Sequence, residues 1–423
     1  MKLALAKAIN AKPHELGGAL AAFLTAFAMF SSYAILRPIR ETMGITSGVQ
    51  TLPALFWGTF AGMLLVQPVY GWLTSRYRRS AFLPWVYLFF VLNILGFHAW
   101  FNAQQDHTWI ARAYFVWVSI FVLFVVAVFW SLMADVFTRE QAGRLFGFVA
   151  AGISTGGLFG PFLAARLAEP IGTINLLLVS ATLLAASMGG LLLVLRWHRR
   201  YGENTAPGED ADQRLGGSAF AAFRQVLQSP YLALIALFVF LLTWVSTFLY
   251  LEQQALVAEV FTDRDAQTRF FGRLDVWVQA GSLATQLFLF GRFYRWFGFR
   301  AVIVSVPVLM ALGFAALALA PTFAVLVAVM FVRRVGEYSL TRPSRDTLYT
   351  SVTREERYKA KSLIDTFVYR GGDATAASAH ALVKAALGLG LSGVAWCGAA
   401  LAALWAVVAW RLGTRHTELN PRR

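Results

Sequence analysis

The chain has 423 residues, of which 58% are hydrophobic and 14% are charged, and its formal net charge at pH 7 is +15. A water-soluble protein of this length needs a far more charged surface, so the composition excludes an ordinary globular protein. The positive charge does not indicate nucleic-acid binding, because most Lys and Arg residues stand in short segments between apolar runs, where they set membrane orientation. The single cysteine, Cys397, excludes a cysteine-rich metal site and a disulfide framework within the chain.

Apolar runs of roughly 20 residues, the length that crosses a hydrocarbon core of about 30 Å, recur along the whole chain. We therefore predict an all-α polytopic membrane protein with twelve transmembrane helices, the first of them retained rather than cleaved as a signal. The runs cover residues 16–36, 51–71, 81–101, 110–134, 145–167, 173–195, 230–251, 273–291, 300–320, 322–341, 362–387 and 390–411.

One long polar interruption, from Arg196 to Pro230, separates six runs from six. It predicts an N-terminal six-helix half at 1–195, a cytoplasmic linker at 196–229 and a C-terminal six-helix half at 230–423. Loop sequences repeat at matching places, since "DVFTREQAGRLFGF" after the fourth run corresponds to "TSVTREERYKAKSLIDTF" after the tenth. Such repeats indicate two halves related by an axis along the membrane normal, with the substrate site between them near the midplane.

Lys and Arg clusters fall in alternate connections between the runs. If the helices alternate in direction, these clusters share one side, and the positive-inside rule predicts that both termini and the linker lie in the cytoplasm. We expect the protein in a bacterial inner membrane.

The arrangement of runs and the turn "GWLTSRYRR" after the second run resemble the major facilitator superfamily over essentially the whole chain. Gly71, Arg76, Arg78 and Arg79 match the loop signature of that family, whereas Ser75 stands where the signature has an acid. The resemblance implies a fold of two six-helix halves. The gating salt bridge that the missing acid makes in the family is not implied.

Two adjacent arginines, Arg333 and Arg334, lie about eleven residues inside the tenth apolar run. A charge near the middle of a bilayer costs at least about 2.5 kcal/mol, so both side chains must face protein or a water-filled cavity. The i,i+4 spacing predicts an ion pair between Arg333 and Glu337, and Tyr338 follows Arg334 on the neighbouring stripe. A purely structural pair explains Arg333 but not Arg334, whereas a site for an anion explains both.

Polar residues of the eleventh run form a second stripe. Arg370, Asp373, His380 and Lys384 fall at helical spacing on one face, which predicts that this face looks into the bundle. His380 fits either a proton carrier or a hydrogen-bonded packing residue.

The first run ends in "SSYAILRPIRETMGI", where Tyr33, Arg37 and Arg40 share a face and Pro38 is expected to bend or break the helix. Arg37 then either lines a cavity or extends to the membrane interface.

The interior candidates contain six cations and three acids. This surplus predicts an anionic substrate, and the planar fork of arginine suits phosphate or carboxylate. The cations are Arg37, Arg40, Arg333, Arg334, Arg370 and Lys384, and the acids are Glu41, Glu337 and Asp373. We assign substrate binding to Arg37, Arg333, Arg334, Arg370, Lys384 and Tyr338, and coupling or gating to Glu337, Asp373, His380 and Glu41.

The fifth run carries "GFVAAGISTGGLFGPFLAA", in which Gly147, Gly156, Gly160 and Pro161 resemble the fifth-helix signature of antiporters of the superfamily. Close helix packing by small residues four apart, including Gly152, is the alternative explanation.

Two blocks, "YAILRPIRETMGI" and "TREERYKAKSLIDTFVYRGGDA", resemble segments of the non-mitochondrial ATP/ADP exchangers of plastids and intracellular bacteria and of their free-living relatives. The resemblance implies that Arg37 and Arg370 bind phosphate and that the substrate is a nucleotide.

The sequence therefore predicts a secondary active transporter, not an enzyme, that exchanges a nucleotide or an organic phosphate. The alternative is a proton-coupled exporter of a drug, siderophore or other amphiphile, and a transport-inactive sensor or scaffold is a third hypothesis. Neither a nucleotide-hydrolysis loop nor a clustered set of metal ligands occurs, so we predict no cofactor and no metal. The expected partners of this monomer are the bilayer, an anionic substrate, and a proton or counter-substrate.

Overall fold

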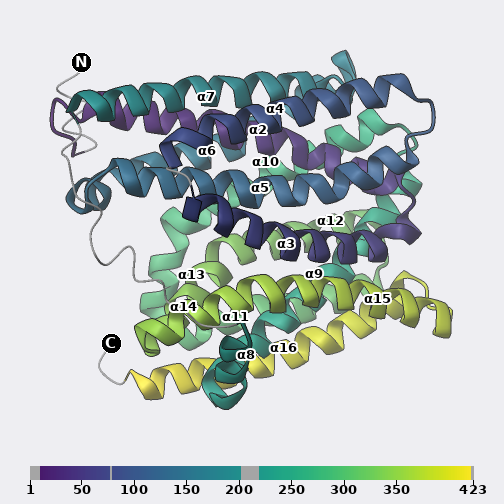
Figure 1. The fold of residues 1–423 in the computed structure, drawn as a ribbon. Coiled ribbons are helices and arrows are strands. Elements are labelled where there is room, and N and C mark those ends of the chain that lie inside the picture. The colour runs from purple at the N-terminus through teal and green to yellow at the C-terminus, as the bar shows by residue number, and fades with distance from the viewer. Residues whose placement is uncertain (1–9, 77–78, 202–218, 421–423) are drawn as a thin grey trace. The chain divides into compact units, whose positions relative to one another are not determined.

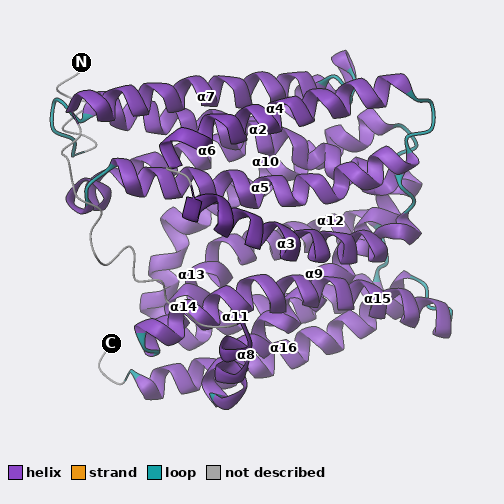
Figure 2. Ribbon diagram, viewed as in Figure 1, coloured by secondary structure: helices purple, strands orange, loops and turns teal. Residues whose placement is uncertain are grey.

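The computed structural model describes residues 10–76, 79–201 and 219–420, and all regular secondary structure in these ranges is helical (Figure 2). The predicted all-α fold class is therefore confirmed. Residues 202–218 of the predicted linker and Arg78 of the loop signature lie outside the described ranges.

The described chain divides into two units. Unit 1 comprises residues 10–47, 61–201 and 261–276, and unit 2 comprises residues 48–60, 219–260 and 277–420. Two helices belong partly to each unit, because α3 (Leu52–Arg76) begins in unit 2 and ends in unit 1, whereas α10 (Arg264–Ala284) begins in unit 1 and ends in unit 2. A single division between residues 195 and 230 does not account for residues 48–60, which belong to unit 2, or for residues 261–276, which belong to unit 1.

The helices of each unit can be followed in Figure 1. Besides its parts of α3 and α10, unit 1 contains α2 (Leu16–Thr46), α4 (Arg79–Ala103), α5 (Thr108–Val136), α6 (Arg139–Ile171) and α7 (Leu176–Tyr201). Besides its parts of those two helices, unit 2 contains η1 (Val49–Thr51), α8 (Ala219–Gln228), α9 (Pro230–Val260), η2 (Thr285–Phe290), α11 (Gly291–Leu319), α12 (Phe323–Gly336), η3 (Glu337–Thr341), α13 (Arg342–Leu348), η4 (Tyr349–Ser351), α14 (Arg354–Leu363), η5 (Ile364–Val368), α15 (Tyr369–Leu387) and α16 (Leu391–Leu419).

Nine segments of the described chain are long and apolar enough to cross a membrane. One of them, Arg264–Leu319, is 56 residues long and changes direction at Gly298, whose φ of 75° is not helical. The helices around Arg333 and Arg370 are not among the nine, because their charged and polar residues lower their apolar character. Each of the twelve predicted runs falls on a helix within a few residues, but the count of twelve spans remains a prediction.

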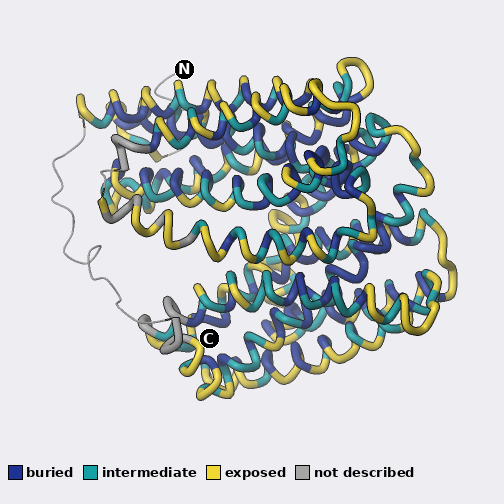
Figure 3. Tube along the Cα trace, turned by 45° about the vertical axis from the view of Figure 1, so that its right-hand side comes forward, coloured by how far each residue is buried: buried dark blue, intermediate teal, exposed yellow. Residues whose placement is uncertain are grey.

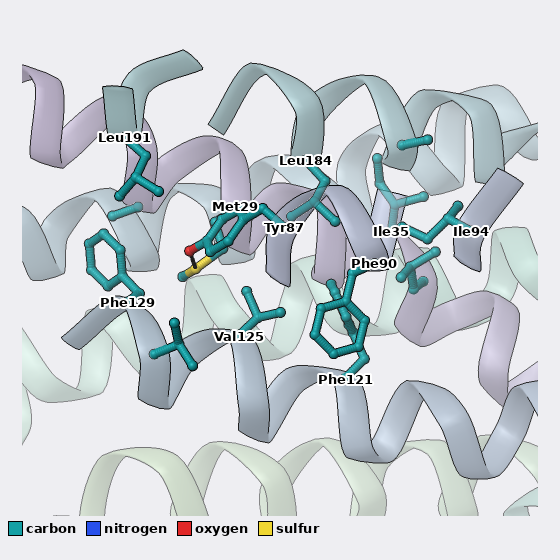
Figure 4. Close-up of a cluster of buried hydrophobic side chains, with 14 of the residues drawn as sticks. Met29, Ile35, Tyr87, Phe90, Ile94, Phe121, Val125, Phe129, Leu184 and Leu191 are labelled. Atoms are coloured by element: carbon teal, nitrogen blue, oxygen red, sulfur yellow. Dashed lines mark hydrogen bonds between the residues drawn. The ribbon is translucent and has the colours of Figure 1, made fainter. Parts of the chain in front are cut away.

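Helix α2 forms the centre of unit 1, where it packs against α5, α6 and α7. Its sequence is apolar or small on most sides, as expected for a helix surrounded by others. Met29 and Ile35 point into a cluster with Tyr87 and Phe121, and the Tyr87 hydroxyl donates to Met29 Sδ at 3.2 Å (Figure 4). Helix α2 also continues through Pro38 to Thr46, so of the two predicted effects of this proline, a bend or a break, the break does not occur.

Exposed residues line the outward faces of the helices (Figure 3), and many of them are large and hydrophobic. Leu65, Trp85 and Leu312 are large hydrophobic residues on such faces. Water would disfavour exposed apolar surface of this extent, whereas lipid chains accept it. The exposed apolar surface and the helical secondary structure therefore indicate a membrane protein.

The glycines of α6 are explained by packing against α2. A Cβ atom at Gly152, Gly156 or Gly160 would come within 2.6 Å of a backbone oxygen of α2, whereas a Cβ at Gly147 would meet nothing within 4 Å. Three of these positions must be glycine for the helices to approach, as in small-residue packing of membrane helices. The packing explanation therefore accounts for Gly152, Gly156 and Gly160, and Gly147 has no such role.

We expect Gly156→Ala to lower the free energy of unfolding by about 1–3 kcal/mol, because its methyl group would overlap the Phe27 carbonyl oxygen. Gly147→Ala is the matched control, since it gains the same helix propensity without a clash. The measurement is the thermal unfolding of both purified variants in detergent. Equal stability of the two variants would contradict the close contact between α2 and α6.

The repeated loop sequences form the same local structure in both units. Thr138 accepts a hydrogen bond from the Gln141 backbone N–H while the Gln141 side chain accepts one from the Thr138 N–H, and Thr353 and Glu356 form the same capping box. These reciprocal bonds satisfy backbone donors that a helix start leaves free. The repeat in "TREQ" and "TREE" thus begins α6 and α14 in equivalent ways.

A buried carboxylate fixes the start of α2 to the start of α6. Glu15 accepts hydrogen bonds from Arg144 Nη2 at 2.9 Å, from the Lys12 backbone N–H at 2.8 Å and from Gln141 Nε2 at 3.3 Å. Burial raises the pKa of Glu15, but these hydrogen bonds and the Arg144 charge outweigh burial and lower the pKa from 4.5 to about 2.

The ionised Glu15 side chain is expected to stabilise the protein above pH 4.5, and this stabilisation is expected to be lost as the pH falls towards 2, because the folded-state pKa lies below the unfolded one. Its full size is about 3 kcal/mol. Glu15→Gln should therefore be less stable than the parent at pH 7, and the difference should fall below half at pH 3. Glu140→Gln, which changes an exposed carboxylate near the same arginine, is the control for thermal unfolding at both pH values. A difference independent of pH would contradict the role of the ionised Glu15.

Candidate functional site

An ion pair lies where α12 passes into η3. Arg333 Nη1 lies 2.8 Å from Glu337 Oε2 and donates to Ser246 Oγ of α9 at 2.9 Å. The Tyr369 hydroxyl of α15 donates to the other oxygen of Glu337 at 3.3 Å. The pair predicted from the i,i+4 spacing is therefore present, and its hydrogen bonds join three helical segments of unit 2.

Three short π-helical segments, η2, η3 and η5, interrupt the helices in the described part of unit 2. A π-turn removes backbone groups from the regular α pattern, and such turns are frequent at functional sites. Segment η3 begins at Glu337, and the carbonyl oxygen of the next residue, Tyr338, accepts a hydrogen bond from Gln286 Nε2 of η2 at 3.0 Å. A side chain of η2 thus satisfies a backbone carbonyl of η3 next to the ion pair of Arg333 and Glu337.

Arg370 is held more loosely than Arg333. Its Nη1 lies 3.4 Å from Asp373 Oδ2, and its guanidinium carbon lies 5.4 Å from the ring centroid of Tyr369. Thr247 of α9 donates to the other oxygen of Asp373 at 3.2 Å. The Arg370 side chain is 26% exposed, compared with 12% for Arg333, so Arg370 is the more accessible of the two cations.

A third cluster joins α9 to α15. Glu252, whose side chain is only 5% exposed, lies 2.7 Å from His380 Nε2 and 3.1 Å from Lys384 Nζ. The two basic residues are one helical turn apart on α15, so both can contact one carboxylate. His380 and Lys384 were predicted to take part in the site, but Glu252 was missed.

The remaining predicted residues of the tenth run differ in their surroundings. Arg334 is buried, with 6% of its surface exposed. Tyr338 is partly buried, and the guanidinium carbon of Arg342 lies 5.0 Å from its ring centroid, within the range of a cation–π contact. Arg342 therefore covers one face of the Tyr338 ring.

In unit 1, the predicted cations of α2 have acidic partners. Arg37 Nε lies 3.6 Å from Asp275 Oδ2 of α10, and Arg40 Nη2 lies 2.7 Å from Glu41 Oε1. Arg40 also donates to Ser119 Oγ of α5 at 3.1 Å. A partner buried in unit 1 favours an interior position of Arg37 over extension to the membrane interface.

The charge balance inferred from sequence needs correction. With Asp275 and Glu252 included, the six candidate cations face five acids rather than three. The surplus of positive charge therefore falls from three to one, and ion pairing explains more of these residues than the sequence indicated. The distances separate the tight pair of Arg333 with Glu337, at 2.8 Å, from the looser pair of Arg370 with Asp373, at 3.4 Å.

The structure brings some of the predicted site residues together within one unit. Arg37 and Glu41 belong to unit 1. Unit 2 contains the other eight, and six of them form the clusters around Glu337, Asp373 and Glu252 described above, whereas Arg334 and Tyr338 are sequence neighbours of Arg333 and Glu337 on α12 and η3. Glu252 follows directly on the seventh predicted run, which ends at residue 251. The sequence therefore places this acid outside the membrane-spanning segment and not among the interior candidates. Asp275 is the partner of Arg37 although the two residues are more than 200 positions apart in sequence, so no local spacing predicts this pair.

Long helices with apolar outer faces and buried ion pairs define a polytopic membrane protein. A family model for the Major Facilitator Superfamily matches residues 18–261, which is more than half of the chain. The chain therefore belongs to the Major Facilitator Superfamily, a family of transporters rather than enzymes, and the resemblance inferred from its loops and helix pattern is confirmed.

Among curated proteins, the chain is similar to two chlamydial carriers and to one drug-resistance protein. It is 28% identical over 163 residues to ADP,ATP carrier protein 2 of Chlamydia pneumoniae and 21% identical over 347 residues to ADP,ATP carrier protein 2 of Chlamydia trachomatis serovar D. These matches cover 31% and 68% of this chain but only 30% and 63% of the two carriers. Multidrug resistance protein 1 of Bacillus subtilis is 27% identical over 243 residues, 56% of either chain.

Solved transporter structures share the fold. The POT family transporter PepTSo matches with a TM-score of 0.67 at 11% identity, covering 95% of this chain and 98% of its own. The nucleoside transporter NupG matches with a TM-score of 0.64 at 15% identity, covering 95% and 99%. Such low identities establish the fold alone.

Proposed function

We propose that this protein is a secondary active transporter that exchanges an anionic small molecule, a nucleotide or an organic phosphate, across a bacterial inner membrane by alternating access. In this proposal it is a monomer of twelve spans, arranged as six-helix halves before residue 196 and after residue 229, with both termini in the cytoplasm. The similarity to the ADP,ATP carriers supports the substrate class.

The observation that carries the proposal is the loose contact of Arg370 with Asp373. At 3.4 Å the guanidinium is beyond the 2.7–2.9 Å of a strong charge-assisted hydrogen bond, and it is partly exposed. A phosphate oxygen that approaches Arg370 can form the shorter bond that Asp373 does not, and the planar guanidinium suits a bidentate contact. Arg333, by contrast, is already bound to Glu337 at 2.8 Å and must exchange one strong partner for another.

Coupling follows from the same exchange of partners. When a phosphate binds Arg370, Asp373 loses its ion-pair partner and, among the described residues, keeps its hydrogen bond from the Thr247 hydroxyl, which favours rearrangement around the carboxylate. Arg334 and Lys384 add positive charge to unit 2, and Arg37 of unit 1 is also a substrate-binding residue in this proposal. Glu337, His380 and Glu41 act as gating or coupling groups in this proposal.

A second candidate function is proton-coupled export of a drug, siderophore or other amphiphile. The similarity to Multidrug resistance protein 1 of Bacillus subtilis supports it, as does the buried contact between Glu252 and His380, a residue type that binds and releases protons near neutral pH.

Counter-exchange in proteoliposomes tests the proposal and separates the two functions. Vesicles loaded with ADP should take up labelled ATP, whereas empty vesicles should not. A thermal-shift panel of ATP, ADP, phosphate, sugar phosphates, siderophores and cationic dyes adds a binding test, because a ligand at about 100 times its Kd stabilises by about 2.7 kcal/mol. Dye flux driven by an imposed pH gradient, without nucleotide uptake or stabilisation, would overturn the exchange proposal in favour of export.

A further inference from the structure

A cavity of about 890 Å³ lies at one end of unit 2, away from the three ion-pair clusters. Three segments form its wall: the turn of α11 around Gly298, the residues Thr347 and Thr350, and the last part of α16. The carboxyl-terminal end of α16 and helix α13 lie at the same end of the unit in Figure 1. Its volume is within the range of about 300–1,000 Å³ that small-molecule sites occupy.

Two arginines give the cavity its charge. Arg295 and Arg300 stand on either side of Gly298, where the change of direction in α11 brings both to the cavity wall. Neither forms an ion pair with any described residue, although the guanidinium carbon of Arg300 lies 5.8 Å from the ring centroid of Trp410. Glu418 is the one acid that the described residues contribute to the wall, so the wall carries net positive charge.

Several other polar groups of the wall already have partners within unit 2. The hydroxyls of Thr347, Thr350, Thr414 and Thr417 each donate to a backbone carbonyl three or four residues earlier. The buried His416 Nδ1 lies 2.9 Å from both the Tyr231 hydroxyl and Ser351 Oγ. The guanidiniums of Arg295 and Arg300 are therefore the charged donors that the described wall offers a ligand, with the Tyr294 hydroxyl beside them, and they select an anion with two or more oxygens.

Aromatic residues beside the cavity favour a ligand that also has an apolar part. Phe297 and Tyr294, which line the cavity on either side of Arg295, are 61% and 39% exposed, and Trp296, outside the lining, is exposed between them in sequence. Aromatic residues next to cations at the end of membrane helices are typical of the level of lipid headgroups. A free phosphate ion would use the arginines alone, whereas a phospholipid would use both the arginines and the aromatic residues.

We propose that this cavity binds the phosphate group of an anionic glycerophospholipid, with Arg295 and Arg300 holding the phosphate oxygens and the aromatic residues contacting the glycerol and the acyl chains. The volume exceeds that of a phosphate and accommodates the headgroup as well. By the predicted orientation this end faces the cytoplasmic leaflet, where anionic lipids and basic residues attract each other.

Lipid binding to the purified full chain tests this proposal. Phosphatidylglycerol and phosphatidylcholine are titrated separately onto delipidated protein in detergent, and bound lipid is counted by native mass spectrometry. The parent should retain one phosphatidylglycerol in preference to phosphatidylcholine, and R295Q/R300Q should weaken that binding about 30-fold. R292Q/R415Q removes the same net charge from exposed positions outside the cavity wall, and it should weaken binding less than about fivefold.

Three results would overturn the proposal: equal losses in the two double variants, equal binding of both lipids, or displacement of phosphatidylglycerol by inorganic phosphate at the same affinity. The last result would assign the site to free phosphate. Circular dichroism and gel filtration confirm that each variant is folded and monodisperse, and the single variant R295Q provides a milder change. The assay measures no transport, so its outcome is independent of the proposed exchange of nucleotides.

Discussion

Alanine at position 370 is expected to reduce the apparent affinity for ATP in the exchange assay by about 10- to 150-fold, the largest effect that we predict for one side chain. Hydrogen bonds from a charged donor contribute about 1.5–3 kcal/mol, which gives this range of affinity. Arg370→Lys should lie between the parent and the alanine variant, because an ammonium keeps the charge but not the bidentate geometry.

The control for Arg370→Ala is Arg292→Ala, which removes an exposed arginine of α11 that is in none of the ion-pair clusters. Removal of Arg370 also takes the ion-pair partner from the buried Asp373, whose remaining hydrogen bond in the described part of the chain comes from Thr247, so the stability of each variant must be measured beside its transport. ATP uptake at the parental rate and affinity in a correctly inserted Arg370→Ala protein would contradict the site assignment. Loss of uptake with parental stability supports it.

The fold was largely predictable from the sequence, because apolar runs of membrane-spanning length and turn residues between them set the helices locally. The pair of Arg333 and Glu337 was predictable for the same reason, since its two members are four residues apart on one helix. The sequence did not reveal that α2 continues through Pro38, because packing of α5, α6 and α7 around α2 supports the helix beyond the proline.

The partners of the cations were less predictable, because they depend on tertiary contacts. Arg37 and Asp275 are separated by more than 200 residues, and only the folded unit brings them within 3.6 Å. The π-helical turn at Glu337 has no clear signal either, because one extra residue per turn leaves the apolar pattern almost unchanged. For these reasons, sequence counting overestimated the surplus of positive charge.

The glycines of α6 illustrate how a structure decides between two explanations of one pattern. The signature of antiporters and the packing of small residues require glycines at overlapping positions. The backbone oxygens of α2 lie where side chains at Gly156 and Gly160 would be, so packing alone explains both. Their presence is therefore not an argument for exchange, and the exchange proposal depends on Arg370 instead.

Glu252→Gln is expected to lower the free energy of unfolding by about 2–3 kcal/mol in the absence of any substrate. Removing one partner of a fully buried ion pair costs about 3–5 kcal/mol, whereas exposed pairs contribute about 0–1 kcal/mol. The Glu252 cluster lies between these limits, because the carboxylate is buried but the Lys384 side chain is 42% exposed and can turn towards solvent. Lys384→Met should cost less, since Glu252 keeps its contact with His380 at 2.7 Å.

Thermal unfolding of the double variant Glu252→Gln/Lys384→Met separates the pair from its surroundings. Because both changes act on one cluster, the double variant should lose less stability than the sum of the two single variants. Glu259→Gln, an exposed carboxylate seven residues further along α9, serves as the matched control and should be unchanged. Additive losses, or an equal loss in Glu259→Gln, would contradict a shared buried site. If instead the coupling energy is found and nucleotide exchange persists in Glu252→Gln, the cluster serves to join α9 to α15 and the substrate contact remains with Arg370.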